Sequence, residues 1–155
     1  MVTLTTQQIG KCGELLVQYM LLKDGVDSAH LTTDPGIDLV AFPNVKASTE
    51  ERRKPVTIQV KTSTTHIGNV GDRYLRWQIP EDCPADYIAA VSFDREKFWL
   101  IRTEEFKRKA YRRASGELDL RLLLSGHEYK RIKQKEEQFK EYEMENAIPK
   151  VFGLK

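Results

Sequence analysis

The sequence predicts an α/β domain in which a central mixed sheet of about five strands is flanked by helices. Residues 5–24 place apolar side chains at helical spacing, residues 26–102 contain short apolar or alternating runs typical of strands, and residues 103–144 return to helical patterns. The length of 155 residues suits one hydrophobic core. We therefore expect a single domain over residues 1–155, with a core over 5–102 and a C-terminal helical extension over 103–155.

The N-terminal segment carries clear helix signals. Thr5 and Gln8 fit a capping box, in which each side chain satisfies a free backbone N–H of the first turn. Apolar residues then recur at three- and four-residue spacing: Ile9, Cys12, Leu16 and Met20. The helix should end near residue 24. Gly10 and Gly13 each cost about 1 kcal/mol relative to alanine inside a helix, so we expect a strand or a ligand to approach closely at these positions.

Strand patterns fill the next part of the chain. We expect a weak strand over 26–31, a turn at 34–36, a short apolar strand over 37–42, a polar loop over 43–55, alternating strands over 56–61 and 73–79, and a hairpin formed by 86–93 and 97–102. Strict alternation over 56–61 places Val56, Ile58 and Val60 on one face and Thr57, Gln59 and Lys61 on the other.

The last third of the chain is predicted to be mainly helical. Thr103 can cap a helix that runs to about residue 114, with acidic residues in its first turn and basic residues in its last. Residues 117–124 form a strand or an extended segment. A charged helix over 127–144 would carry one stripe of larger side chains: Tyr129, Ile132, Phe139 and Tyr142. That stripe is a core or homodimer contact, or alternatively a surface for a protein partner.

Composition excludes several classes of protein. Six Phe, six Tyr and two Trp are too many for a disordered chain, even with 31% charged residues. The longest uncharged apolar run, residues 15–22, is less than half of the roughly 20 residues that span a bilayer. Because the first residues are polar rather than an apolar signal core, we expect cytoplasmic localisation. Cys12 and Cys83, without a CxxC pattern, are expected to be free thiols rather than zinc ligands or a disulfide.

Charged and polar residues stand in two of the predicted strands. Asp38 interrupts an apolar strand, and Lys61 ends another strand two residues after Gln59. An unpaired buried charge costs several kcal/mol. Asp38 and Lys61 therefore either form a salt bridge between neighbouring strands, or lie at a site where Asp38 and Gln59 bind a metal ion and Lys61 contacts a reacting phosphate.

Three short motifs resemble the PD-(D/E)XK nuclease superfamily, the restriction-endonuclease-like proteins. They are Gly-x-x-Gly-Glu ending at Glu14, Pro-Gly-Ile-Asp-Leu-Val over 35–40, and Ile-Gln-Val-Lys-Thr over 58–62. The order of helix, carboxylate strand and lysine strand matches as well. The sequence is similar to small stand-alone members: Holliday-junction resolvases, intron-encoded homing endonucleases and methylation-dependent restriction nucleases. The resemblance covers residues 5–102.

The resemblance implies a metal site and the roles of its residues. Asp38 would be the metal carboxylate, Glu14 would complete the site from the helix, and Gln59 and Val60 would supply further oxygen ligands. Lys61 would orient the attacking water or stabilise charge on the phosphorane. Gln59 stands where most members have Glu or Asp, so weaker or single-ion Mg²⁺ binding is expected, with Mn²⁺ able to substitute.

The implied activity is hydrolysis of DNA phosphodiester bonds by water, leaving 5′-phosphate and 3′-hydroxyl ends. The substrate would be double-stranded or branched DNA, cut by a homodimer or homotetramer, because two strands require two sites. The sequence leaves open whether the enzyme is of the homing or restriction type or of the junction-resolving type. A catalytically silent DNA-binding module is the alternative, made plausible by the neutral Gln59.

Candidate DNA contacts lie in the basic segments around these strands. The loop between the two site strands carries Lys46, Arg52, Arg53 and Lys54. Thr62, Ser63 and His66 follow the lysine and offer donors to phosphate. A basic helix is expected to carry Lys107, Arg108, Arg112 and Arg113. Each cation could instead serve only solubility, and the residues Tyr74, Trp77, Phe98 and Trp99 are expected to pack in the core rather than stack on bases.

Overall fold

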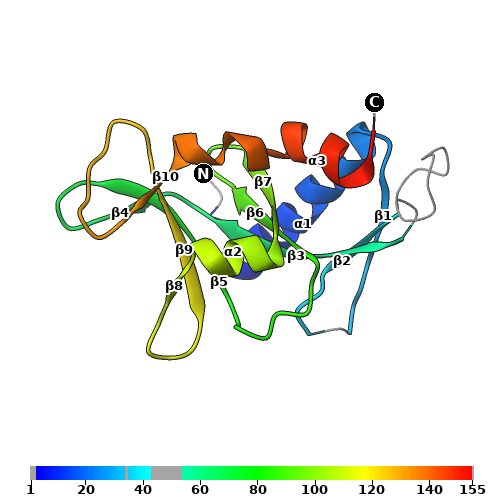
Figure 1. Ribbon diagram of the computed structural model, residues 1–155, viewed down its shortest axis with the longest axis horizontal. Coiled ribbons are helices and arrows are strands. Elements are labelled where there is room, and N and C mark those ends of the chain that lie inside the picture. The colour runs from blue at the N-terminus through cyan, green and yellow to red at the C-terminus, as the bar shows by residue number, and fades with distance from the viewer. Residues whose placement is uncertain (1–2, 34, 43–53, 155) are drawn as a thin grey trace.

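The central sheet carries the strand order β1-β2-β3-β6-β7 in the computed structural model, which describes residues 3–33, 35–42 and 54–154. These strands are β1 (Asp27–His30), β2 (Leu39–Phe42), β3 (Val56–Ser63), β6 (Tyr87–Ser92) and β7 (Lys97–Arg102). β3 and β6 are parallel, whereas the other neighbours are antiparallel. The predicted fold class, a mixed central sheet of five strands flanked by helices, is confirmed (Figure 1).

Helix α1 (Thr6–Lys23) packs on one face of the central sheet, together with α3 (Met144–Phe152). The predicted capping box of Thr5 and Gln8 is present. At Gly13 the helix lies so close to β3 that an added Cβ would overlap Thr62 Oγ1, whereas no described atom lies within 4 Å of the corresponding position at Gly10. The expected close approach of a strand is therefore confirmed for Gly13, whereas no strand among the described residues approaches Gly10.

A second sheet covers the opposite face of the central sheet. It has the order β10-β9-β5-β4, built from β10 (Gln134–Lys135), β9 (Leu118–Leu123), β5 (Arg73–Ile79) and β4 (His66–Ile67), and β8 (Tyr111–Arg112) pairs with β9. Alternate residues of β5 and β9, such as Leu75 and Leu120, pack with Ile88 of β6 and with Phe106 of α2 (Thr103–Lys109). Residues 73–79 were expected in the central sheet, and this second layer was not anticipated.

The C-terminal third differs most from the sequence prediction. Helix α2 ends at Lys109, and Thr103 is its buried first residue rather than its cap, because its hydroxyl donates to the Ala85 carbonyl at 2.6 Å. The predicted helix over 127–144 is wrong: this stretch contains turns, β10 and the 3-10 helix η2 (Glu136–Tyr142). Residues 103–155 are therefore not a helical extension, because β9 is an inner strand of the second sheet.

Other expectations concern membranes and thiols. Among residues 3–33, 35–42 and 54–154, no helix combines the length and apolar character needed to cross a membrane. Cys12 and Cys83 are free, and Cys83 is buried in the core between the two sheets. Trp77 and Trp99 are also buried there, edge to face at 5.4 Å between ring centroids, in agreement with the predicted core role.

Candidate metal and nuclease site

Asp38 directly precedes β2, and its backbone is hydrogen-bonded to both neighbouring segments. Its backbone N–H donates to the Ile58 carbonyl, and its carbonyl accepts from Leu31 N–H, both at 2.9 Å. Its carboxylate Oδ2 accepts a 2.7 Å hydrogen bond from the Val60 N–H of β3. In a continued antiparallel ladder, the Val60 N–H would donate to a backbone carbonyl of the chain before β2. The Asp38 carboxylate accepts this hydrogen bond instead, so β3 fixes the orientation of the carboxylate.

Glu14 reaches the same region from α1. Its side chain is 24% exposed, and its Oε2 lies 2.7 Å from Lys11 Nζ and 3.4 Å from His30 Nδ1. The preceding residue, Gly13, contacts β3 directly. The close contact at Gly13 therefore fixes the part of the helix backbone that carries Glu14 against β3, and the Glu14 carboxylate itself contacts Lys11 and His30.

The pKa of Asp38 depends on the charges of two other predicted site residues, Glu14 and Lys61. Burial raises the pKa of the Asp38 carboxyl above its ordinary value; the Val60 hydrogen bond opposes this effect, the charge of Glu14 adds to it, and Lys61 and His30 oppose it. Asp38 therefore lies close enough to Glu14 and to Lys61 for their charges to act on it. Glu14 lies on the α1 face of the central sheet, whereas Lys61 lies on the opposite face of β3 from Ile58 and Val60, which pack against α1.

His30 lies beside Glu14 and was missed by the sequence reasoning. It lies on β1, and its ring nitrogen Nδ1 is 3.5 Å from Lys11 Nζ. Its Nε2 is buried and has no hydrogen-bond partner among the described residues. The sequence carries no local signal for this role, because the proximity of His30 to Glu14 arises only when β1 packs beside α1.

Gln59 points to the same face of β3 as Lys61, but its side chain is buried rather than open to a metal ion from solvent. Only 7% of the residue is exposed. Its Oε1 accepts from the Cys83 thiol at 3.2 Å. Burial raises the pKa of that thiol, so Cys83 is a neutral donor. An amide oxygen has two lone pairs, so Gln59 retains one for a second partner.

The Val60 carbonyl completes the set of candidate oxygen atoms. Because the Val60 N–H points toward Asp38, and the N–H and C=O of one strand residue point to the same side, this carbonyl also faces the Asp38 side of β3. The last paired residue of β2 on that side is Leu39, opposite Ile58. The Val60 carbonyl therefore lies beyond the end of the β2 ladder.

The predicted ligands carry the kinds of oxygen atom that a hard divalent cation binds. Two carboxylates, one amide oxygen and one backbone carbonyl are the oxygen donors that Mg²⁺ prefers. Glu14 and Asp38 repel each other, and a cation between them would relieve the effect of Glu14 on the Asp38 pKa. Within residues 3–33, 35–42 and 54–154, no group of three or more His, Cys, Asp or Glu side chains is arranged to hold a metal. The neutral oxygens are thus required for any such site.

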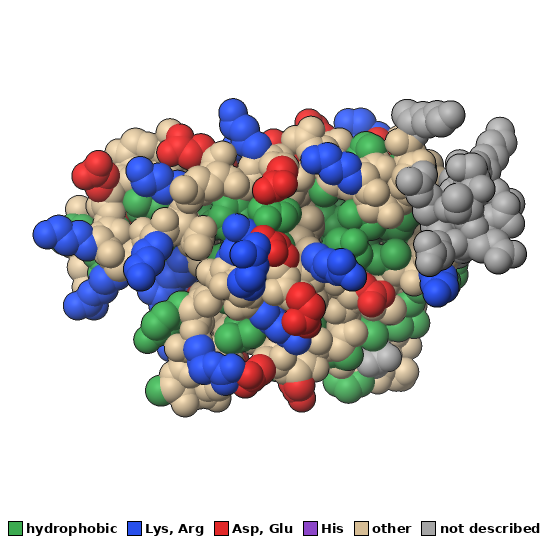
Figure 2. Space-filling model, in the orientation of Figure 1, with side chains coloured by type: hydrophobic (Ala, Val, Ile, Leu, Met, Phe, Trp, Pro, Cys, Tyr) green, Lys and Arg blue, Asp and Glu red, His purple; other side chains and the backbone are tan. Residues whose placement is uncertain are grey.

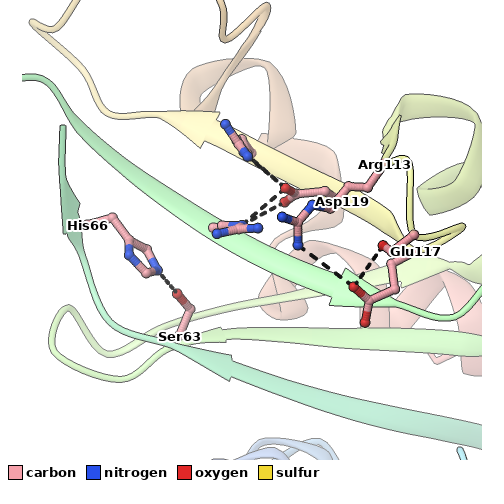
Figure 3. Close-up of polar contacts among 8 residues, drawn as sticks. Ser63, His66, Arg113, Glu117 and Asp119 are labelled. Carbon is pink, nitrogen blue, oxygen red and sulfur yellow. Dashed lines mark hydrogen bonds and ion pairs between the residues drawn. The ribbon is translucent and has the colours of Figure 1, made fainter. Parts of the chain in front are cut away.

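The predicted DNA contacts are placed unevenly. Lys46, Arg52 and Arg53 lie outside the described residues, and Lys54 is exposed just before β3. Thr62 Oγ1 is buried against α1. Ser63 is buried and donates to the Thr64 carbonyl, while its Oγ lies 3.4 Å from His66 Nε2 (Figure 3). Thr62 and His66 are both half-buried as residues, but the Thr62 hydroxyl itself is buried.

The predicted basic helix over 107–113 is wrong in extent and in charge. Residues 111 and 112 belong to β8, and each of the four cations has an acidic partner. The pairs are Lys107 with Glu104, Arg108 with Glu105, Arg112 with Glu81 and Arg113 with Glu117. These ion pairs offset most of the positive charge that the sequence assigned to this segment.

Comparison with known proteins supports the fold. None of the protein-family models searched matches this chain, and no curated protein sequence matches it. Among solved structures, the chain is similar to a bacterial homing endonuclease, I-Ssp6803I, with a TM-score of 0.65 and 16% sequence identity. The similarity covers 97% of this chain and 94% of that chain. The two chains thus share a fold over nearly their whole length, including the C-terminal third.

Proposed function

We propose that this chain is a metal-dependent DNA endonuclease that hydrolyses phosphodiester bonds. The observation that carries the proposal is the Asp38 carboxylate, which the Val60 N–H of β3 holds in place and on which the charges of Glu14 and Lys61 both act. The fold that the chain shares with a bacterial homing endonuclease supports the same conclusion.

Each residue has a role in the proposed site. Glu14 and Asp38 would hold Mg²⁺, or Mn²⁺ in its place, with the Gln59 amide oxygen and the Val60 carbonyl as further ligands. When bound, such an ion lowers the pKa of a coordinated water and offsets negative charge on the phosphate. The Val60 N–H holds Asp38 Oδ2 and leaves Oδ1 for the ion.

Lys61 supplies positive charge where the reaction needs it. Attack of water on the phosphorus atom builds negative charge on the non-bridging oxygens, and the Lys61 ammonium stabilises that charge. The attack breaks the bond between phosphorus and the 3′ oxygen, so the products are a 5′-phosphate and a 3′-hydroxyl. No covalent nucleophile from the protein is needed.

Cleavage of two strands requires two such sites. We therefore propose a homodimer or a homotetramer on double-stranded or branched DNA. A two-fold arrangement that matches a palindromic duplex would give a homing or restriction type of enzyme, and one that spans a four-way junction would give a resolving type.

A second candidate is a silent DNA-binding module with the nuclease fold. The observation that favours it is Gln59, which is neutral, buried, and hydrogen-bonded to the Cys83 thiol. A site with only two carboxylates binds a hard cation more weakly than a site with three.

Incubation with linear, supercoiled and four-way-junction DNA, in Mg²⁺ or Mn²⁺, tests the proposal. Asp38→Asn keeps an acceptor for the Val60 N–H, and both it and Lys61→Met should lower the cleavage rate by at least about 100-fold. Asp82→Asn and Lys23→Met change exposed residues of the same types and should cleave normally. Binding without cleavage by the wild type would support the silent module. Neither binding nor cleavage would contradict both functions.

A further inference from the structure

Asp119 on β9 is a fully buried carboxylate shared by two arginines. Arg76 Nε donates to both of its oxygens at 3.1 Å. Arg121 donates to Oδ2 through Nε at 3.1 Å and through Nη2 at 2.9 Å (Figure 3). The Asp119 side chain is 0% exposed. Because two guanidinium groups share one carboxylate, the cluster keeps a net positive charge.

The strand register brings this cluster to the outer face of the second sheet. On β5, Leu75, Trp77 and Ile79 point into the core, so Arg76 and Gln78 point outward. Across the ladder, Arg76 is opposite Arg121 and Gln78 is opposite Asp119. The polar positions of the two strands therefore meet on one surface.

Gln78 connects a third arginine to the cluster. With its amide oxygen turned to accept, Gln78 bonds to Arg76 Nη2 at 2.6 Å and to Arg113 Nη1 at 2.7 Å. Arg113 is also 3.7 Å from Glu117 and is 41% exposed. We call Arg76, Arg113 and Arg121 the arginine cluster.

The arginine cluster has donors available for a ligand. A guanidinium carries five N–H donors, and the bonds to Asp119 use only part of them. The Arg76 and Arg121 side chains are 25% and 32% exposed. Asp119 fixes the planar guanidinium groups of Arg76 and Arg121 in place. The paired N–H donors of a guanidinium group match the spacing of two oxygens of a phosphate group.

The charge of the surrounding segments is complementary to a polyanion. Residues 63–79 and 118–135 contain seven Lys or Arg against three Asp or Glu, a surplus of four, whereas the whole chain has a surplus of two. The rest of the chain is therefore slightly acidic. Figure 2 shows Lys and Arg side chains at the end of the molecule where β4 and β10 lie. A positive surface of this kind is the usual electrostatic signature of DNA binding.

Direct contacts connect this surface to the strand of the candidate site. Ser63 lies two residues, about 6.6 Å, beyond Lys61 on β3, and its hydroxyl is 3.4 Å from His66 Nε2. The His66 ring stacks on Tyr74 at 5.4 Å, and the Arg121 guanidinium lies over the same Tyr74 ring at 6.0 Å. Burial lowers the pKa of His66, and the charges of Arg76 and Arg121 lower it further, so His66 lies within their positive field.

We propose that the outer face of the second sheet binds the phosphate backbone of the DNA duplex beside the cleavage site. The arginine cluster supplies the donors, and Asp119 is the positioning residue that holds Arg76 and Arg121. This inference rests on the proposed function, because it takes DNA as the substrate of the neighbouring site.

Single substitutions test the inference without leaving Asp119 unpaired. In Arg76→Gln or Arg121→Gln, Asp119 keeps the other arginine. Arg108→Gln on α2 is the matched control, because Arg108 is 72% exposed and pairs with Glu105. Fluorescence anisotropy with a labelled mixed-sequence duplex, in EDTA and over a range of NaCl, should show several-fold weaker binding for the two cluster variants. The slope of log affinity against log salt should fall by about 1 for each of them. The control should bind as the wild type does.

Labelling of the wild-type protein gives a second readout that needs no variant to fold. Bound duplex should protect Arg76 and Arg121 from phenylglyoxal and leave Arg108 reactive, as mapped by mass spectrometry. Wild-type binding with unchanged salt slopes in the cluster variants and no protection of the cluster would overturn the inference while leaving the proposed function in place. A wild-type protein that binds no DNA would overturn both.

Discussion

Replacing Gly13 by alanine should disturb the contact that seats α1 on β3. The added Cβ would overlap Thr62 Oγ1 and would lie 3.0 and 3.1 Å from Thr62 Cβ and Cγ2. Overpacking of a core costs about 1–3 kcal/mol, and the severity of this overlap places the cost near the upper end. The better helix propensity of alanine returns about 1 kcal/mol. We expect Gly13→Ala to lower the free energy of unfolding by about 2 kcal/mol.

Gly10→Ala is the matched control, because it lies on the same helix and no described atom lies within 4 Å of its added Cβ. It should raise the free energy of unfolding by about 1 kcal/mol. Urea denaturation followed by tryptophan fluorescence should thus separate the two variants by about 3 kcal/mol, roughly 100-fold in the unfolding constant. Thr62→Ala should restore part of the stability of Gly13→Ala. Equal stability of the two alanine variants would refute the close seating of α1, and with it the placement of Glu14.

Two further predictions concern buried polar groups. The pKa of Asp38 is raised above 3.8 in the folded protein, so the folded state binds the proton more tightly than the unfolded state does. The stability that protonated Asp38 contributes is therefore present in acid and is lost as the pH rises through the raised pKa. Asp38→Asn, which keeps an acceptor for Val60 N–H, should therefore melt above the wild type at neutral pH but not in acid; an equal melting temperature at neutral pH would contradict this. Trp77 donates to the Val91 carbonyl at 3.0 Å, whereas Trp99 Nε1 has no partner among the described residues. Trp77→Phe should cost about 1 kcal/mol more than Trp99→Phe in urea denaturation.

The parts of the fold that could be predicted are those with a local cause. The capping box of Thr5 and Gln8, the alternation along β3, and the hairpin of β6 and β7 all follow from residues close together in the chain. The capping box depends on residues three apart, and the side chains of β3 alternate between the two faces of the sheet although both faces are covered.

The parts that were missed depend on distant partners. The spacing of Ile132 and Phe139 resembles a helix, yet residues 134–135 pair with β9 and interrupt it. β5 and β9 pair Trp77 with Leu120, and nothing in either strand alone indicates that they form a second sheet.

Sequence reasoning found one of two carboxylates that interrupt apolar strand patterns, the half-buried Asp38, and missed the buried Asp119. Asp38 was singled out because it interrupts an apolar strand. Asp119, between Leu118 and Leu120, gives the same signal and could have been singled out by the same reasoning. Its arginine partners could not have been assigned without the register between β5 and β9, which places Arg76 opposite Arg121.

Crystals of the wild-type protein soaked in Mn²⁺ test the central claim most directly. An anomalous difference map should show an ion at coordination distance, about 2.1 Å, from carboxylate oxygens of both Glu14 and Asp38, with the Lys61 ammonium nearby. An ion that contacts neither carboxylate would contradict the account.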